Sequence, residues 1–154
     1  MKKITAITLT AAIVALAGAA MAADSNTLTV QASVTGTCKF SSGTSTLNFG
    51  ALDPSVGTNV NGSTTTNFWC TKGVTTDAIA ANNGANWSGT KRQMKDTVSA
   101  DLIPYTLTLT PDGSANTGPA APRTLTIGGT VLGTDYTGKT AGSYSDTVTL
   151  NITP

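Results

Sequence analysis

The chain has 154 residues, of which 11% are charged, and it contains neither histidine nor glutamate. Its formal net charge of +1 provides no basic stripe of the kind that binds nucleic acid, so we expect no nucleic-acid partner. Most acid–base and nucleophile–base pairs of enzymes need a histidine or a glutamate. The composition therefore predicts a protein that is not an enzyme and needs no cofactor.

The N-terminal 22 residues have the order of features found in a secretory signal peptide. Lys2 and Lys3 precede an apolar run that ends in Ala20-Met21-Ala22. We expect cleavage after Ala22, and the alternative, a membrane anchor, is disfavoured because the run is short. The mature chain, residues 23–154, then has a length that suits one domain and carries seven basic residues against eight aspartates.

Asn26–Val34 is the first segment with a clear period. Leu28, Val30, Ala32 and Val34 alternate with polar residues, which predicts a strand with one apolar face. Two interpretations are open at this point. The apolar face enters the core of this chain, or it enters the core of another.

The only two cysteines, Cys38 and Cys70, follow this segment. In an exported chain they predict a disulfide, for which a single connectivity exists. It would close a loop of about thirty residues and add roughly 3–4 kcal/mol of stability in the chain-entropy model. A metal site is the weaker alternative, because no histidine or further cysteine is available to complete it.

Alternating segments recur along the rest of the chain. Residues 81–100 interrupt them, and we expect a long polar surface loop there. Gly128-Gly129 lies inside one segment and suggests a bulge or bend. About seven strands and no convincing helix predict an all-β sandwich. Beyond 26–34, the expected strands are 45–50, 64–70, 74–80, 103–110, 123–131 and 143–153.

The last of these segments places Val148, Leu150 and Ile152 on one face, and the sequence ends at Pro154. If the sandwich needs one more strand after it, we expect that strand to come from elsewhere, because an exposed edge is a hazard. Tyr144 lies at the entry to this strand. It is either a tyrosine corner of an immunoglobulin-like fold or an ordinary, partly buried aromatic.

Several of these features together resemble the spore coat protein U-like family, which includes the archaic (Csu-type) chaperone–usher pilins. The resemblance covers essentially the whole mature chain. Its most specific part is the pattern Gly-x-Tyr-x-Asp-Thr, formed here by Gly142, Tyr144, Asp146 and Thr147. The order and spacing of five pieces carry it: VTGTCKF (34–40), LNFG (47–50), Cys70, IPYTLTL (103–109) and the C-terminal AGSYSDTVTLNITP (141–154).

The resemblance implies a fold for residues 35–154: an incomplete immunoglobulin-like β-sandwich that lacks its last strand and is completed by a donor strand. A periplasmic chaperone fills the resulting groove first. At the outer-membrane usher, the N-terminal strand of the next subunit, here residues 23–34, replaces the chaperone. By analogy the donor side chains are Leu28, Val30, Ala32 and Val34, and the acceptor groove is lined by Val148, Leu150 and Ile152.

The function that the resemblance implies is that of a structural subunit of a surface pilus, assembled by donor-strand exchange and supporting adhesion or biofilm formation. The partners would be neighbouring pilin subunits, in a homopolymer or a mixed fibre, together with the chaperone and the usher. The protein would be exported through the periplasm to the cell surface or secreted. The alternative is a self-contained, secreted β-sandwich that binds carbohydrate or a surface, with Trp87 as a candidate contact.

Overall fold

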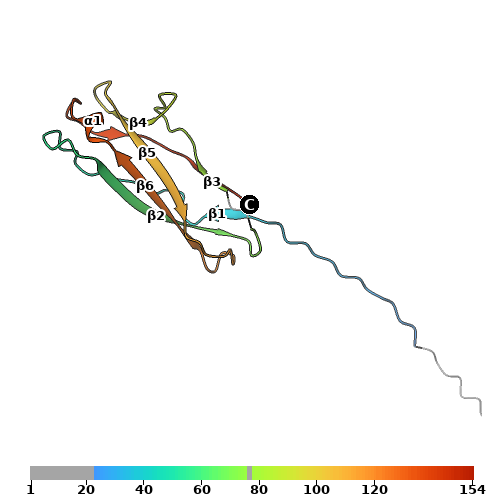
Figure 1. Cartoon of the computed structure of the whole chain (residues 1–154). Helices are drawn as coiled ribbons and strands as arrows, with labels where there is room; N and C mark the ends of the chain where they lie inside the picture. Colours follow the sequence, from blue (N-terminus) through green and yellow to red (C-terminus); the bar gives the residue numbers. More distant parts are fainter. Residues whose placement is uncertain (1–22, 76–77) are drawn as a thin grey trace, which may run out of the picture. The chain divides into compact units, whose positions relative to one another are not determined.

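The computed structural model describes residues 23–75 and 78–154 (Figure 1), so the expected signal peptide lies outside the described residues. The chain divides into two units, residues 1–33 and 34–154. In the described part of the first unit, residues 23–33, no helix or strand is assigned. The side chains of Leu28 and Val30 are each 82% exposed there. A strand is assigned only where its backbone is hydrogen-bonded to a partner strand. The segment 26–34, which was expected to be a strand, is not assigned as a strand here.

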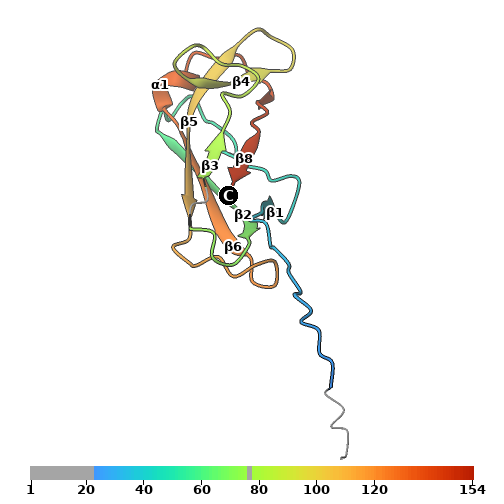
Figure 2. The ribbon, with the colours of Figure 1, turned by 90° about the vertical axis from the view of Figure 1, so that its right-hand side faces the viewer.

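The second unit is built from antiparallel strands, which confirms the all-β fold class. A short sheet pairs β3 (Ala78–Ala81) with β8 (Leu150–Thr153). Figure 2 shows this pair in front of the long strands of the main sheet. In spatial order, the main sheet contains β1 (Cys38–Phe40), β2 (Val60–Cys70), β6 (Arg123–Val131), β5 (Leu102–Pro111), β4 (Arg92–Asp96) and β7 (Tyr144–Ser145).

The core is formed by alternate residues of the long strands, as the period of two requires. Each such side chain, when fully buried, contributes roughly 1.5–3 kcal/mol. Two clusters result, one around Phe68 and Leu125 and one around Ile103 and Val131. The buried apolar side chains are Phe68, Cys70, Ile103, Tyr105, Leu125, Ile127, Val131 and Tyr136.

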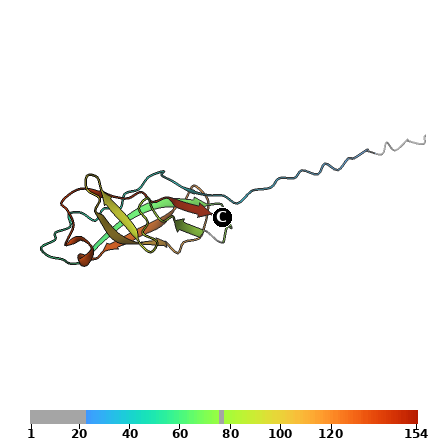
Figure 3. The ribbon, with the colours of Figure 1, turned by 90° about the horizontal axis from the view of Figure 1, so that it is seen from above.

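One short helix was not expected. Residues 132–142 lie between the expected strands 123–131 and 143–153 and contain α1 (Gly133–Tyr136). Tyr136 is buried, and its hydroxyl donates a hydrogen bond to the carbonyl oxygen of Thr58 over 2.7 Å. Contacts of this tyrosine with residues distant in the sequence stabilise the helical turn. No local sequence pattern predicts such a turn. In Figures 1 and 3, α1 lies at one end of the domain and the C-terminus at the other.

We expect Gly133→Ala to destabilise the domain much more than Gly138→Ala. A Cβ atom at Gly133 would overlap the backbone carbonyl of Gly57, and the Gly133 amide is held at 3.0 Å from Oδ1 of Asn59. Overpacking of this kind costs about 1–3 kcal/mol. Gly138 has no atom within 4 Å of the same position, so its substitution should change the unfolding free energy by less than about 0.5 kcal/mol. Urea unfolding of both variants measures the difference, and equal effects would contradict the contact.

The prediction of an uninterrupted loop over 81–100 was wrong, because β4 lies within it. Arg92 explains why this polar stretch pairs: its Nε donates to the carbonyl oxygen of Asn82 over 2.8 Å, and its Nη2 to that of Ala81 over 3.1 Å. The side chain of Met94 is half-buried against the core. Trp87 remains in the loop before β4 and is 40% exposed, as expected for a loop residue.

Two further strand predictions differ from the structure. No strand is assigned to residues 45–50, although Leu47 and Phe49 are half-buried as their alternation predicts. The segment 143–153 is split into β7 and β8, which pair with different neighbours, β4 and β3. With β1 and β4 added, the described residues contain eight strands instead of about seven.

Candidate functional site

The C-terminal segment from Tyr144 to Leu150 forms one wall of the site. Every second side chain along it is half-buried and the ones between are exposed, so the alternation continues through the gap between β7 and β8. In the described part of the chain, β7 and β8 are each the last strand of their sheet. Each therefore has one edge without a partner strand, and such an edge is a template for pairing.

Two adjacent hollows lie between this wall and the segment 45–54. The first has a volume of about 400 Å³ and the second of about 540 Å³. They share Leu47, Asn48, Phe49, Met94 and Tyr144, and we call them together the groove. The other apolar side chains of the first hollow are Tyr105, Leu107, Ile127, Val148 and Leu150, and those of the second include Leu52, Ile103 and Tyr136.

The segment 45–50 forms the opposite wall of the groove, and it packs against two glycines of the main sheet. Gly62 and Gly129 face each other in a continuous β2–β6 ladder, so the bulge predicted at Gly128-Gly129 is absent from this ladder. A Cβ atom at Gly129 would lie 2.9 Å from side-chain carbons of both Leu47 and Phe49. The glycines are therefore required for close approach, because the segment 45–50 crosses the sheet at this point.

Asp146 is a polar residue within an otherwise apolar wall. Its Oδ2 accepts a hydrogen bond from the Tyr105 hydroxyl over 2.7 Å, and its Oδ1 accepts from the Ala85 amide over 2.9 Å and from Asn86 Nδ2 over 3.3 Å. Burial raises the pKa of Tyr105 well above its usual value, and the hydrogen bond to Asp146 and the charge of that carboxylate raise it further, against the opposing charge of Arg92. The hydroxyl therefore stays a donor throughout the physiological range.

The stretch between β7 and β8 is held by side-chain and backbone hydrogen bonds where ladder pairing is interrupted. Asn82 makes two hydrogen bonds to the backbone of Thr149: its side-chain Oδ1 accepts from the Thr149 amide over 2.9 Å, and its backbone N–H donates to the Thr149 carbonyl over 3.0 Å. Together with Asp146, these contacts anchor the groove wall to residues 82–86. The anchoring leaves the groove-facing side of the wall available.

The other residues of the Gly-x-Tyr-x-Asp-Thr pattern shape the end of the wall. The Tyr144 hydroxyl donates to the carbonyl oxygen of Thr140 over 2.6 Å, which is the backward bond of a tyrosine corner. Gly142 packs so closely on Asp96 that a Cβ atom there would overlap the carboxylate. Thr147 is exposed.

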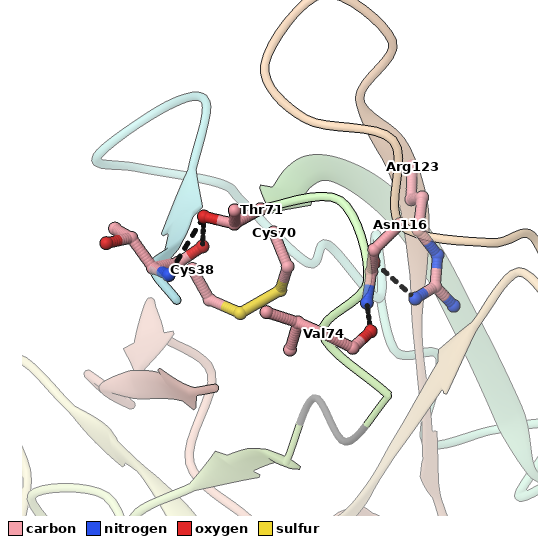
Figure 4. Close-up of a disulfide and its surroundings, with 7 residues drawn as sticks. Cys38, Cys70, Thr71, Val74, Asn116 and Arg123 are labelled. Atoms are coloured by element: carbon pink, nitrogen blue, oxygen red, sulfur yellow. Dashed lines mark hydrogen bonds between the residues drawn. A yellow bond between two sulfur atoms is a disulfide. The ribbon is translucent and has the colours of Figure 1, made fainter. Parts of the chain in front are cut away.

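The predicted disulfide between Cys38 and Cys70 is confirmed, with a sequence separation of 32. It joins the first facing pair of the β1–β2 ladder (Figure 4). Beside it, the amide of Thr71 donates to the carbonyl of Thr37 over 2.8 Å, and the amide of Thr37 donates to the Thr71 hydroxyl over 3.0 Å. Cys38, the first strand residue after the exposed segment 23–34, is thus covalently fixed to β2.

A model of the Spore Coat Protein U domain matches residues 24–151. The chain belongs to this family. No curated protein matches it. Among solved structures, it is similar to a chain of the CsuC–CsuE chaperone–tip adhesion subunit pre-assembly complex from the archaic chaperone–usher Csu pili of Acinetobacter baumannii, with 20% identity and a TM-score of 0.49. The similarity covers 77% of this chain, and the chain spans 40% of the length of that one.

In this Spore Coat Protein U domain, two of the three predicted acceptor residues line the groove. Val148 and Leu150 are in the first hollow. Ile152 packs instead against the cluster around Phe68 and faces Ile79 across the β3–β8 ladder. The predicted donor side chains, which all lie at exposed positions, are Leu28, Val30, Ala32 and Val34.

Sequence reasoning missed the facing wall and part of the floor of this groove. Leu47 and Phe49 belong to the LNFG motif, so the motif was a signal, although it gave no indication of their role. Met94 had no signal, because it lies between Gln93 and Lys95 in a polar stretch. In the described residues, no helix is long and apolar enough to cross a membrane.

Proposed function

We propose that this Spore Coat Protein U domain is a structural subunit of a surface pilus, assembled in the chaperone–usher pathway by exchange of donor strands. The observation that carries the proposal is the groove beside the open edge of 144–150, together with the exposed, alternating segment 26–34. Residues 1–22 are then the signal peptide, 23–34 the donor strand and 35–154 the pilin domain.

The physical basis of the proposal is that the groove and the segment 26–34 both expose apolar side chains, which each could cover for the other. The groove exposes apolar side chains beside unpaired backbone groups, and both are aggregation hazards until a strand covers them. Each donated aliphatic side chain contributes roughly 1.5–3 kcal/mol when fully buried, before the cost of ordering the segment. Backbone hydrogen bonds add affinity, as in other cases of strand addition.

The partners follow from this arrangement. A periplasmic chaperone would cover the groove before assembly, and the usher would bring in the next subunit. The interface is heterologous, because the donor segment and the groove are different surfaces, so its repetition gives an open filament. The protein would be exported through the periplasm to the cell surface, where the fibre supports adhesion or biofilm formation.

Deletion of residues 23–34 tests the proposal. The truncated chain, purified with its chaperone, should bind a synthetic peptide of residues 24–36 but form no polymer. At a free peptide concentration about 100 times Kd, the peptide should stabilise the domain by about 2.7 kcal/mol, measured as a rise in Tm. A peptide carrying Val30→Asp is the matched control and should give no shift. If the truncated chain stays unfolded even with chaperone and peptide present, the segment belongs to its own core and the proposal is wrong.

The exposed Trp87 supports a second candidate, a self-contained β-sandwich that binds carbohydrate or a surface. Aromatic side chains on exposed loops offer a flat apolar face to such ligands. This candidate predicts that the mature chain is a stable, soluble monomer without any chaperone. The pilin proposal predicts poor recovery of the chain alone and good recovery when its chaperone is co-expressed.

A further inference from the structure

We propose a register for the donor strand, an inference that rests on the proposed function. Residues 28–34 of a second copy lie antiparallel to residues 144–150, beside the groove. The facing pairs are Leu28 with Leu150, Val30 with Val148, Ala32 with Asp146, and Val34 with Tyr144.

The alternation of both segments restricts the choice. In the acceptor, the side chains of 144, 146, 148 and 150 are half-buried, and those of 145, 147 and 149 are exposed. In the donor, the apolar positions are 28, 30, 32 and 34. A shift by one residue would turn every donor side chain to the wrong face. The allowed registers therefore differ by steps of two residues, or roughly 6.6–6.8 Å along the strand.

Asp146 selects among these registers. It is the one polar inward residue between Tyr144 and Leu150, and its carboxylate is engaged by Tyr105, Ala85 and Asn86. A large apolar side chain placed against this carboxylate would strip it of water without supplying a hydrogen bond. Ala32 is the smallest of the four donor side chains and covers it least. A step of two residues in either direction would put Val30 or Val34 there instead.

The remaining pairs then match the two hollows. Leu28 and Val30 face Leu150 and Val148, which line the first hollow. Val34 faces Tyr144, where the second hollow opens toward Phe49, Leu52 and Tyr136. The largest donor side chains thus meet apolar surface, and the smallest meets the one charge.

The direction follows from the ends of the domain. All six strand pairs described are antiparallel, and antiparallel pairing is slightly the more stable per residue. The acceptor segment runs from the α1 end toward the C-terminus (Figures 1 and 3). A parallel donor would bring its Val34 to the C-terminal end, where Gly36 of the acceptor already lies beside Val74 and Pro154. An antiparallel donor leaves the groove at the α1 end, away from these residues.

Cysteine cross-linking in the full-length chain reads the register directly. Gln31 faces Thr147 on the outward side, and both side chains are exposed. Directly opposite residues have Cβ atoms about 4.5–5.5 Å apart, whereas diagonal neighbours are about 7–8 Å apart by Cα, at or beyond the limit of about 7 Å for a disulfide. Thr147→Cys is combined in turn with Thr29→Cys, Gln31→Cys and Ser33→Cys.

We expect a covalent ladder of multimers, after mild oxidation and non-reducing electrophoresis, only for Gln31→Cys with Thr147→Cys. The other two pairs should give no more linked multimer than the single-cysteine variants. The single variants control for exchange of a new thiol with the native disulfide. A second acceptor site tests the direction. Thr149→Cys should link to Thr29→Cys if the strands are antiparallel and to Ser33→Cys if they are parallel.

The outcomes separate the register from the function. A ladder at Thr29→Cys or Ser33→Cys with Thr147→Cys, or polymers that link at none of the three positions, overturns the register and leaves the pilus proposal standing. A parallel pattern at Thr149→Cys overturns the direction. A link within one chain, or chains that never assemble, contradicts the proposed function itself.

Discussion

We expect Val30→Asp to abolish polymer formation while leaving the chaperone-bound subunit intact. The aspartate would enter an apolar hollow lined by Leu107, Ile127 and Val148, where it finds no cationic partner among the lining residues. An unpaired buried charge costs several kcal/mol, and the loss of the valine removes roughly 1.5–3 kcal/mol more. Nothing in the subunit's own domain changes, because the segment 23–33 is outside that unit.

Gln31→Asp is the matched control for this variant. It introduces the same charge one residue away, on the outward side of the donor strand, where water solvates it. Electron microscopy of cell-surface material and size-exclusion chromatography of the chaperone complex measure the two effects. Fibres in normal amounts from Val30→Asp would show that Val30 is not buried between copies. Loss of fibres from both variants would indicate that any added charge in this segment prevents assembly.

The second large effect is expected from removing the disulfide. Cys38→Ala with Cys70→Ala should lower the unfolding free energy by about 3–4 kcal/mol, because the bond constrains a loop of 32 residues in the denatured chain. Alanine is chosen at both positions because Cys70 is fully buried, and a serine there would bury a hydroxyl. Urea unfolding of the truncated domain with donor peptide bound measures the change.

Reduction of the unmodified protein is the internal control. It should produce the same loss of stability as the double substitution, and it should have no further effect on the double variant. A midpoint that does not move would mean that the denatured chain is already compact, so that the cross-link removes little of its freedom.

The features that were predictable from sequence depend on local rules. Alternation located the half-buried face of 144–152, and the cysteine count identified the disulfide, because each of these signals lies within a few residues or in a single pair. The position of Val148 and Leu150 in the groove was expected from the family resemblance, because alternation alone identifies only the face on which they lie. Ile152 continues the same alternation but lies outside the groove and pairs with Ile79 of β3, a position that only the sheet topology could show.

The features that were not predictable depend on distant contacts. In the sequence, Arg92 has the character of a charged surface residue. In the structure it holds β4 in place by donating hydrogen bonds to carbonyl groups ten and eleven residues away. Gly129 suggested a bulge because glycine weakens strands, whereas its role is to leave space for Leu47 and Phe49. Both depend on which segments meet in three dimensions, and a one-dimensional pattern does not contain that information.

The position of the disulfide has a consequence for how a fibre would carry tension. Only residues 35–37 separate the donor segment from Cys38. A pull on a fibre joined through that segment would reach Cys38 and pass through the covalent bond into β2, so it would not peel the three residues of β1 away one at a time. β2 faces β6 at nine residue pairs. The load would therefore act along a long ladder whose hydrogen bonds share the force, and each subunit would resist extension as one mechanical element.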